Sequence, residues 1–243
     1  MYQNFKHRAY FRSAGLLALL IVASTATAQE KSPLFYGVQF EQLEYRWGND
    51  TDVLAWDGDA LVGTDDLKLR FQSEGEYSIK ESAFETLESQ ILVQRPISSF
   101  FDVKAGVRID NPRGSDRVYG VLGVQGLAPQ WFEVDADLFL SNKSDFSARL
   151  DVEYELLITN RIILTPSAEV NFAFSEDRDI MVGSGLGKTE LGVRLSYDLV
   201  DRSIAPYIGI HYERLFGSTK KLARAENESD DEFFIVAGVR VRF

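Results

Sequence analysis

The sequence predicts an all-β protein, a 12-stranded antiparallel transmembrane β-barrel of the outer-membrane type. Two observations predict it. Apolar residues alternate with polar ones over runs of 9–13 residues, as in Phe101-Val103-Ala105-Val107-Ile109, which is longer than ordinary globular strands and suits a tilted strand crossing a bilayer. The other face of these runs carries charged residues in mid-strand, such as Lys104 and Arg108. A soluble sandwich would turn that face to water, whereas a membrane barrel turns it into a polar lumen.

The pattern resolves into twelve strands, an even number as bacterial single-chain barrels have. In the first strand the apolar phase slips between Phe40 and Leu43, which predicts a β-bulge. Short turns, such as 200–203, alternate with longer polar loops, and 217–230 is expected to be a mobile charged loop. The predicted strands are 36–47, 52–62, 66–74, 83–94, 100–110, 117–126, 131–140, 144–154, 161–174, 187–199, 204–215 and 231–243.

The first 28 residues have the features of a secretory signal peptide. Three basic residues precede an apolar stretch at 14–23, and Ala26-Thr27-Ala28 matches a cleavage site. The alternative, an N-terminal membrane anchor, needs a longer apolar stretch. We therefore expect a signal peptide at 1–28, a short periplasmic stub at 29–35 and the barrel at 36–243.

Composition narrows the classes of function. The chain has 26 basic and 37 acidic residues, a net charge of −11, and the net charge is −14 without residues 1–28. This balance argues against a nucleic-acid partner. With no cysteine, the protein has no disulfide framework, thiolate metal site or cysteine nucleophile.

Several segments resemble the copper resistance protein B family of outer-membrane proteins, in order and across the whole barrel. They include FEQLEYRWGNDTDVLAWDGD at 40–59, SEGE at 73–76, VYGVLGVQGLAPQWFEVD at 118–135, RLDVEYELLITNRIIL at 149–164, GSGL at 183–186, ELGVRLSYD at 190–198 and IAPYIGIHYERLFG at 204–217. The resemblance implies a barrel in the outer membrane of a Gram-negative bacterium, copper binding, and a role in copper resistance and homeostasis. It also implies a periplasmic multicopper oxidase as a partner in the pathway.

Family members commonly carry a Met- and His-rich segment before the barrel, and QEKSPLFYG at 29–37 lacks both residues. A copper site must then use barrel residues. Imidazole suits Cu(II), thioether suits Cu(I), and carboxylates prefer harder cations. The candidate metal ligands are His211, Glu213, Asp57, Asp59, Asp135, Asp137, Glu41, Glu44 and Met181.

Other interpretations of these residues stay open. Lumenal carboxylates can form ion pairs with Arg46, Arg70, Arg108, Arg149, Arg194, Arg240 and Arg242, filling a small barrel. The protein can then be a copper-binding or copper-passing barrel in outer-membrane lipid, or a general small-solute or cation pore favoured by the acidic charge. A third alternative is a membrane-embedded lipid hydrolase with His211 as its base.

Overall fold

A computed structural model describes residues 33–111 and 115–243 of the chain. The predicted signal peptide and the first residues of the predicted stub lie outside this part. Among the described residues, no helix is both long enough and apolar enough to cross a membrane.

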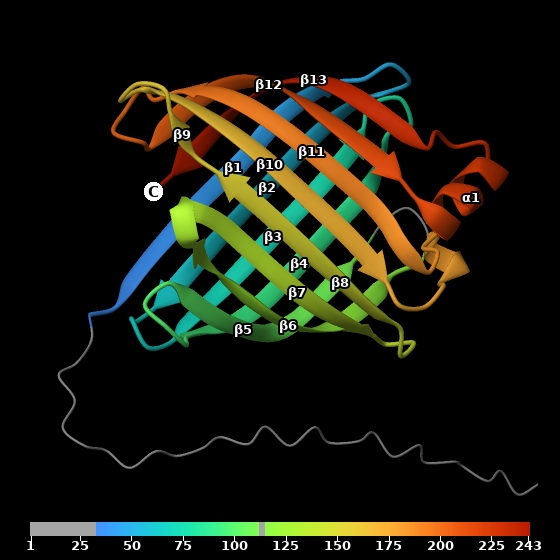
Figure 1. The fold of residues 1–243 in the computed structure, drawn as a ribbon, viewed down its shortest axis with the longest axis horizontal. Helices are drawn as coiled ribbons and strands as arrows, with labels where there is room; N and C mark the ends of the chain where they lie inside the picture. The colour runs from blue at the N-terminus through green and yellow to red at the C-terminus, as the bar shows by residue number, and fades with distance from the viewer. Residues whose placement is uncertain (1–32, 112–114) are drawn as a thin grey trace, which may run out of the picture. The chain divides into compact units, whose positions relative to one another are not determined.

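Twelve long antiparallel strands form a closed barrel in the described part of the chain, as the sequence predicts (Figure 1). Each strand pairs with the next along the chain, and β13 pairs with β1 to close the ring. A two-residue piece, β9 (Leu156–Leu157), extends the pairing of β8 along β10 beyond Glu155. The long strands are β1 (Phe35–Trp47), β2 (Asp52–Gly63), β3 (Lys68–Ser78), β4 (Ala83–Pro96), β5 (Phe101–Asp110), β6 (Arg117–Ala128), β7 (Phe132–Ser141), β8 (Phe146–Tyr154), β10 (Ile162–Ala173), β11 (Gly185–Tyr197), β12 (Ile204–Leu215) and β13 (Asp231–Arg242).

Alternation sorts the side chains between the outside of the barrel and its interior, which we call the lumen. On β5, Val107 is exposed on the outer face, while Lys104 is fully buried on the lumenal face. The predicted bulge in β1 is present, because the register shifts between Phe40 and Gln42. The extra residue lets both Glu41 and Gln42 line the lumen.

The lumen is less uniformly polar than the alternation implies. Two buried apolar clusters face inward, one formed by Val53, Ala55, Tyr207, Phe234 and Val236 and the other by Leu92, Tyr119, Val121 and Phe139. The guanidinium of Arg108 lies over the rings of Tyr119 and Phe139, 5.1 and 4.6 Å from their centroids. Aromatic rings and arginine side chains thus fill part of the lumen together.

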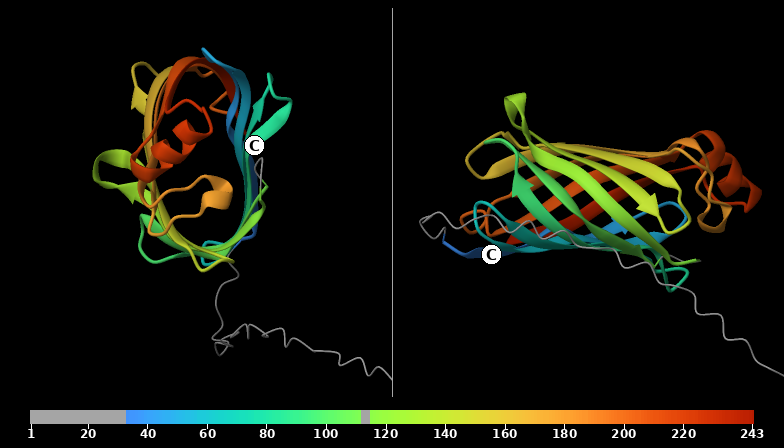
Figure 2. Two further views of the ribbon diagram at one scale, coloured as in Figure 1. Left: turned by 90° about the vertical axis from the view of Figure 1, so that its right-hand side faces the viewer. Right: turned by 90° about the horizontal axis from the view of Figure 1, so that it is seen from below.

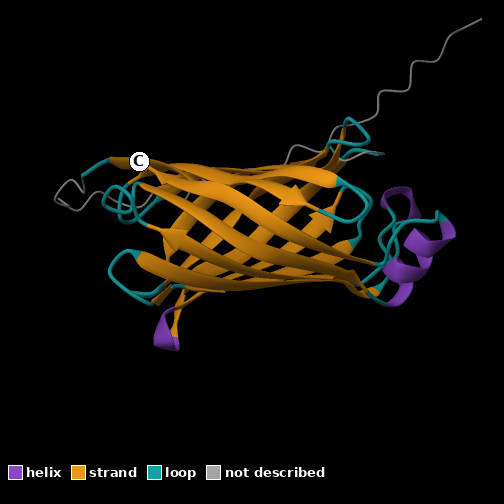
Figure 3. Ribbon diagram, turned by 90° about the horizontal axis from the view of Figure 1, so that it is seen from above, coloured by secondary structure: helices purple, strands orange, loops and turns teal. Residues whose placement is uncertain are grey.

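The two ends of the barrel differ (Figure 3). At one end, which we call the turn end, short connections join the strands and the 3-10 turn η1 (Pro129–Trp131) lies between β6 and β7. At the other, the mouth, lie α1 (Gly217–Ala225) and the 3-10 turn η2 (Arg178–Ile180). Looking into the mouth, Figure 2 (left) shows α1 and the η2 segment across the ring of strands.

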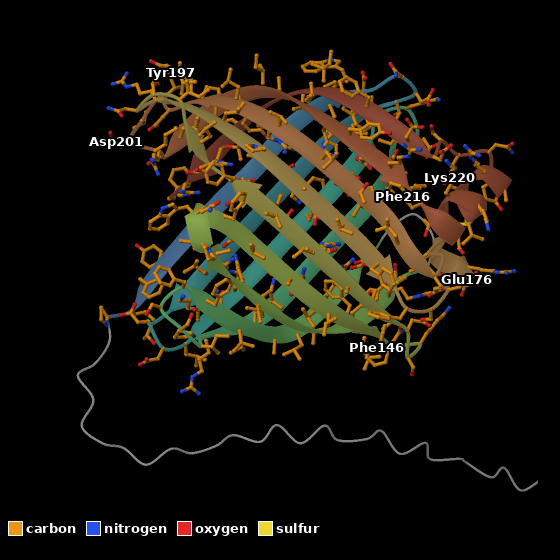
Figure 4. All side chains as sticks on the ribbon, viewed as in Figure 1. Phe146, Glu176, Tyr197, Asp201, Phe216 and Lys220 are labelled. Atoms are coloured by element: carbon orange, nitrogen blue, oxygen red, sulfur yellow. The ribbon has the colours of Figure 1, made fainter. Side chains whose placement is uncertain are left out.

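The labelled side chains mark the same two ends (Figure 4). Tyr197 and Asp201 lie at the turn end, and Glu176, Phe216 and Lys220 lie at the mouth. The expectation of a loop at 217–230 is wrong for residues 217–225, which form α1, and Thr219 Oγ1 accepts a hydrogen bond from Gly183 N at 3.0 Å. The predicted third strand also ended too early, since β3 continues to Ser78.

Candidate metal centre

Three potential metal ligands meet on the lumenal face of β11 and β12. The turn at 200–203 sets a register in which Glu190 lies opposite Glu213 and Gly192 lies opposite His211. Because side chains alternate along a strand, His211 and Glu213 share one face. The hairpin therefore places one imidazole and two carboxylates at a single point of the wall, and we call these three residues the histidine centre.

The distances within the histidine centre suit a metal ion. Nε2 of His211 lies 3.1 Å from Oε1 of Glu213 and 3.4 Å from Oε2 of Glu190. One ligand atom from each of the three residues lies within 4.8 Å of the others. Ligand atoms that each bind an ion at about 2.0–2.1 Å lie roughly 3 Å apart. Small side-chain adjustments would therefore bring all three onto one ion.

His211 is held by its surroundings. The residue is only 4% exposed, and its ring lies 6.2 Å from that of Phe234, centroid to centroid. Its Nδ1 has no hydrogen-bond partner among the described residues, whereas Nε2 faces the two carboxylates. Nε2 is therefore the nitrogen placed to bind a metal, and its hydrogen-bonding neighbours are carboxylates rather than a serine.

A lysine partly neutralises the histidine centre. Nζ of Lys188 lies 2.8 Å from Glu190 and 2.5 Å from Glu213. Arg46 adds a longer contact of 3.4 Å to Glu213 and a closer one to Glu76. A metal ion that used the carboxylate oxygens would compete with the ammonium of Lys188.

The donor atoms of the histidine centre favour divalent metal ions over Cu(I). Imidazole and carboxylate donors suit Cu(II) and Zn(II), whereas Cu(I) prefers thioether and thiolate sulfur. Met181 does not belong to the histidine centre. It follows η2 at the mouth of the barrel and lines a separate space there, the mouth chamber described below. The residues present thus fit Cu(II) better than Cu(I).

The predicted pair Asp135 and Asp137 lies elsewhere, around a buried lysine. Nζ of Lys104 is 2.6 Å from Asp135 and 2.9 Å from Asp137. The side chain of Lys104 is 1% exposed. A Cβ at Gly123 would lie 1.9 Å from Oδ1 of Asp137, which shows how tightly this site is packed. We call these three charged residues the lysine site.

The other acidic residues predicted as metal ligands lie outside the histidine centre. Glu44 accepts hydrogen bonds from Arg46, Arg194 and Tyr207. Asp59 accepts one from Gln39 at 2.7 Å, and the side chain of Gln39 also donates to Glu41 at 3.2 Å. Asp57 faces the central cavity described below.

The ion-pair interpretation of the lumen is confirmed. All seven arginines named from the sequence lie within 4.0 Å of a carboxylate: Arg46, Arg70, Arg108, Arg149, Arg194, Arg240 and Arg242. Arg149 alone contacts Glu74, Glu88 and Glu169, which come from three different strands. Such networks hold opposite walls of the barrel together.

Two adjoining spaces lie among the lumenal side chains of the described residues. The central cavity has a volume of about 160 Å³ and is lined by ten acidic and four basic side chains together with His211. The mouth chamber, about 500 Å³, extends to η2 and to the segment that follows α1. Glu169 and Glu190 line both spaces, which places the histidine centre between them.

Ion pairs hold the η2 segment at the mouth. Nε and Nη2 of Arg117 donate to the Asp177 carboxylate at 2.8 and 3.1 Å, and Lys143 contacts Asp179. The hydrogen bond from Arg117 lowers the pKa of the Asp177 carboxyl below its ordinary value.

Sequence reasoning missed Glu190 and Lys188. The sequence does contain a signal for Glu190, because two residues equally far from the turn of an antiparallel hairpin lie opposite each other. Applied to the turn predicted at 200–203, that rule pairs Glu190 with Glu213.

A family model and two related proteins all carry the same description, copper resistance protein B. The family model described as "Copper resistance protein B precursor" matches residues 34–243. Copper resistance protein B of Escherichia coli is 39% identical over 212 residues, which cover 87% of this chain and 71% of that protein. A Copper resistance protein B homolog of Pseudomonas syringae pv. tomato is 36% identical over 203 residues, covering 84% and 68%.

Two solved porin structures align with most of the chain at low sequence identity. A KdgM porin aligns with 85% of this chain and 99% of its own, at 11% identity and a TM-score of 0.48. A NanC porin aligns with 84% and 98%, at 14% identity and a TM-score of 0.48.

Proposed function

Because the chain belongs to the copper resistance protein B family, we propose that it binds copper ions in its lumen and passes them across the outer membrane in copper resistance and homeostasis. The convergence of His211, Glu190 and Glu213 carries the proposal. Copper is cargo in this account, and the histidine centre is where it is held.

The chemistry of the centre makes Cu(II) the preferred ion. Nε2 of His211 supplies nitrogen, and the two glutamates supply charge and oxygen. Lys188 lies between the two carboxylates and is displaced as the ion binds, so that a positive charge is present both before and after loading. This exchange keeps the affinity moderate, as a site that must also release its ion requires.

Location and partners are part of the same proposal. The outer face of the strands is apolar, which suits outer-membrane lipid. The family places copper resistance at the centre of the function, and we infer a periplasmic multicopper oxidase as a partner in the same pathway. The turn end, which carries the short connections, would face the periplasm.

The test is a Cu(II) titration of the purified full-length barrel in detergent. The wild-type protein is expected to bind one Cu(II) saturably, and His211→Ala and Glu190→Gln are expected to weaken binding by about tenfold or more. Glu153→Gln is the matched control. It removes a carboxylate from the same cavity, and that carboxylate pairs with Arg240 outside the histidine centre.

Two results of the titration would count against copper binding at the histidine centre. An unchanged affinity in His211→Ala, or an equal loss in Glu153→Gln, would contradict the proposal. Each variant is first shown to be folded by its heat-dependent mobility in gel electrophoresis, so that lost binding reports the site.

A second candidate function, a general cation pore, has its own support. Acidic side chains outnumber basic ones around the central cavity, ten to four. A pore of this kind would conduct K⁺ regardless of whether His211 is present. A wild-type barrel that conducts K⁺ but shows no saturable Cu(II) binding in the titration above would favour it.

A further inference from the structure

Six carboxylates on six neighbouring strands lie in one continuous row on the lumenal wall. Each is directly opposite the next in the strand register, without an intervening residue. From β13 to β7, the row consists of Glu232, Glu213, Glu190, Glu169, Asp151 and Asp135.

The row runs along the barrel as well as around it. Glu232 is the second residue of β13, at the mouth, and Asp135 is the fourth residue of β7, toward the turn end. Neighbouring strands lie about 4.8 Å apart and tilt by about 40°, so each step advances about 3 Å along the barrel axis. The six carboxylates thus cover about 15 Å of an apolar band about 25 Å tall. Gln125 and Asp102 continue the same row to the turn end.

This arrangement is costly for folding. Like charges directly opposite each other destabilise a sheet, and the row contains five such pairs in succession. On β7 and β8, the lumenal pair next to Asp135 and Asp151 has opposite charges, because Asp137 lies opposite Arg149. Ion pairing of the lumen therefore does not require the row.

The fifth carboxylate of the row, Asp151, has no ion pair among the described residues. Asp151 lies between Arg149 and Glu153 on the lumenal face of β8. Arg149 pairs with Glu74, Glu88 and Glu169, which leaves Asp151 to face the central cavity. The carboxylate is thus available to a mobile cation.

Buried oxygens in the same cavity independently indicate a ligand. Oδ1 of Asp137 and Oε1 of Gln90 have no hydrogen-bond partner among the described residues, and each residue is only 6% exposed. Both residues line the central cavity beside Asp135 and Asp151. Oxygens in such a place require water or a cation.

We propose that the row is a cation path through the lumen, along which hydrated monovalent or divalent cations move in steps from one carboxylate to the next. The mouth chamber reaches the first four carboxylates, and the central cavity reaches Glu190, Glu169, Asp151 and Asp135. Several weak sites in sequence allow an ion both to enter and to leave. The path deepens the proposed function through Glu190 and Glu213, but its selectivity does not need copper to bind.

The test measures K⁺ against Cl⁻ selectivity of the full-length protein in planar bilayers, from the reversal potential in a KCl gradient. The wild-type barrel is expected to prefer K⁺, and Asp151→Asn is expected to lower the permeability ratio by about threefold or more. Glu153→Gln is the matched control, since it removes one charge from the same strand and cavity but lies outside the row. It is expected to change the ratio much less.

A second variant covers the case in which Asp151→Asn fails to fold. Glu232→Gln alters the end of the row at the mouth and is expected to shift the ratio in the same direction. A barrel without conductance or without preference for K⁺ would overturn the proposal, as would equal effects of Asp151→Asn and Glu153→Gln. Because no copper is present, failure here is distinct from failure of the copper titration.

Discussion

Two sites in the lumen share one plan, a lysine between two carboxylates, and differ in what surrounds it. In the lysine site, Lys104 on β5 binds Asp135 and Asp137 of β7. In the histidine centre, Lys188 binds Glu190 of its own strand and Glu213 of β12. Only the second site contains an imidazole, and its lysine side chain is 27% exposed compared with 1% for Lys104.

The difference shows which lumenal carboxylates are free to exchange partners. A metal ion at the lysine site would have to displace a fully buried ammonium, which would be left without a counter-charge. At the histidine centre the displaced ammonium has access to water, and His211 adds a nitrogen donor. The same residue types thus give a fixed structural ion pair in one place and an exchangeable cation site in the other. At the lysine site, Lys104 keeps its ion pairs, and Oδ1 of Asp135, which has no hydrogen-bond partner among the described residues, is left to contact a passing cation.

The largest expected effect is on stability and separates the two lysines. Lys104→Met leaves two neighbouring aspartates without their shared counter-charge, and we expect a loss of about 3–5 kcal/mol in the free energy of unfolding. Lys188→Met is expected to cost much less, because its glutamates keep contacts with His211 and Arg46. Urea unfolding of the barrel in lipid vesicles measures both, and equal losses would remove the distinction.

The next effect is on metal affinity. Removing the competing ammonium in Lys188→Met is expected to tighten Cu(II) binding by about tenfold, equivalent to about 1.4 kcal/mol. Lys68→Met serves as the matched control, since it removes a lumenal lysine that pairs with Asp102 at 2.7 Å, away from the histidine centre. Weaker binding in Lys188→Met would show that the lysine supports the site rather than competing for it.

The smallest effect extends the comparison to the ion pair between Arg117 and Asp177 at the mouth. The pKa of Asp177 is lowered by its hydrogen bond from Arg117, so the stabilisation is present above the ordinary value of 3.8 and is lost as the pH falls through the lowered pKa. Amide exchange at 175–184, corrected for the intrinsic effect of pH, is expected to rise about fivefold once Asp177 is protonated.

Asp177→Asn should reproduce that loosening at neutral pH while leaving the barrel strands protected. Protection at 175–184 that is the same in acid as at neutral pH would show that other contacts, such as that of Thr219 with Gly183, hold the segment.

Much of the fold follows from the sequence because alternation and turn spacing are local. Strand number, the bulge after Phe40 and the lumenal arginine pairs are all read from period-two patterns. Residues 217–225 were harder: the segment is short and charged, and its helix packs at the mouth through contacts such as Thr219 with Gly183, which depend on the closed barrel.

The candidate site was only half predictable. His211 and Glu213 follow from their spacing on one strand, whereas Glu190 and Lys188 enter through the register with the neighbouring strand. Asp135 and Asp137 have the same spacing as His211 and Glu213, yet they surround Lys104 from another strand. Spacing along one strand identifies a shared face, and only pairing across strands shows what that face meets.

The central claim is that Nε2 of His211 holds copper with Glu190 and Glu213, and electron paramagnetic resonance of the Cu(II)-loaded protein tests it most directly. The account predicts superhyperfine coupling to a single imidazole nitrogen in the wild-type protein and in Glu153→Gln, and loss of that coupling in His211→Ala. Coupling that persists in His211→Ala, or a wild-type spectrum with oxygen ligands alone, would contradict it.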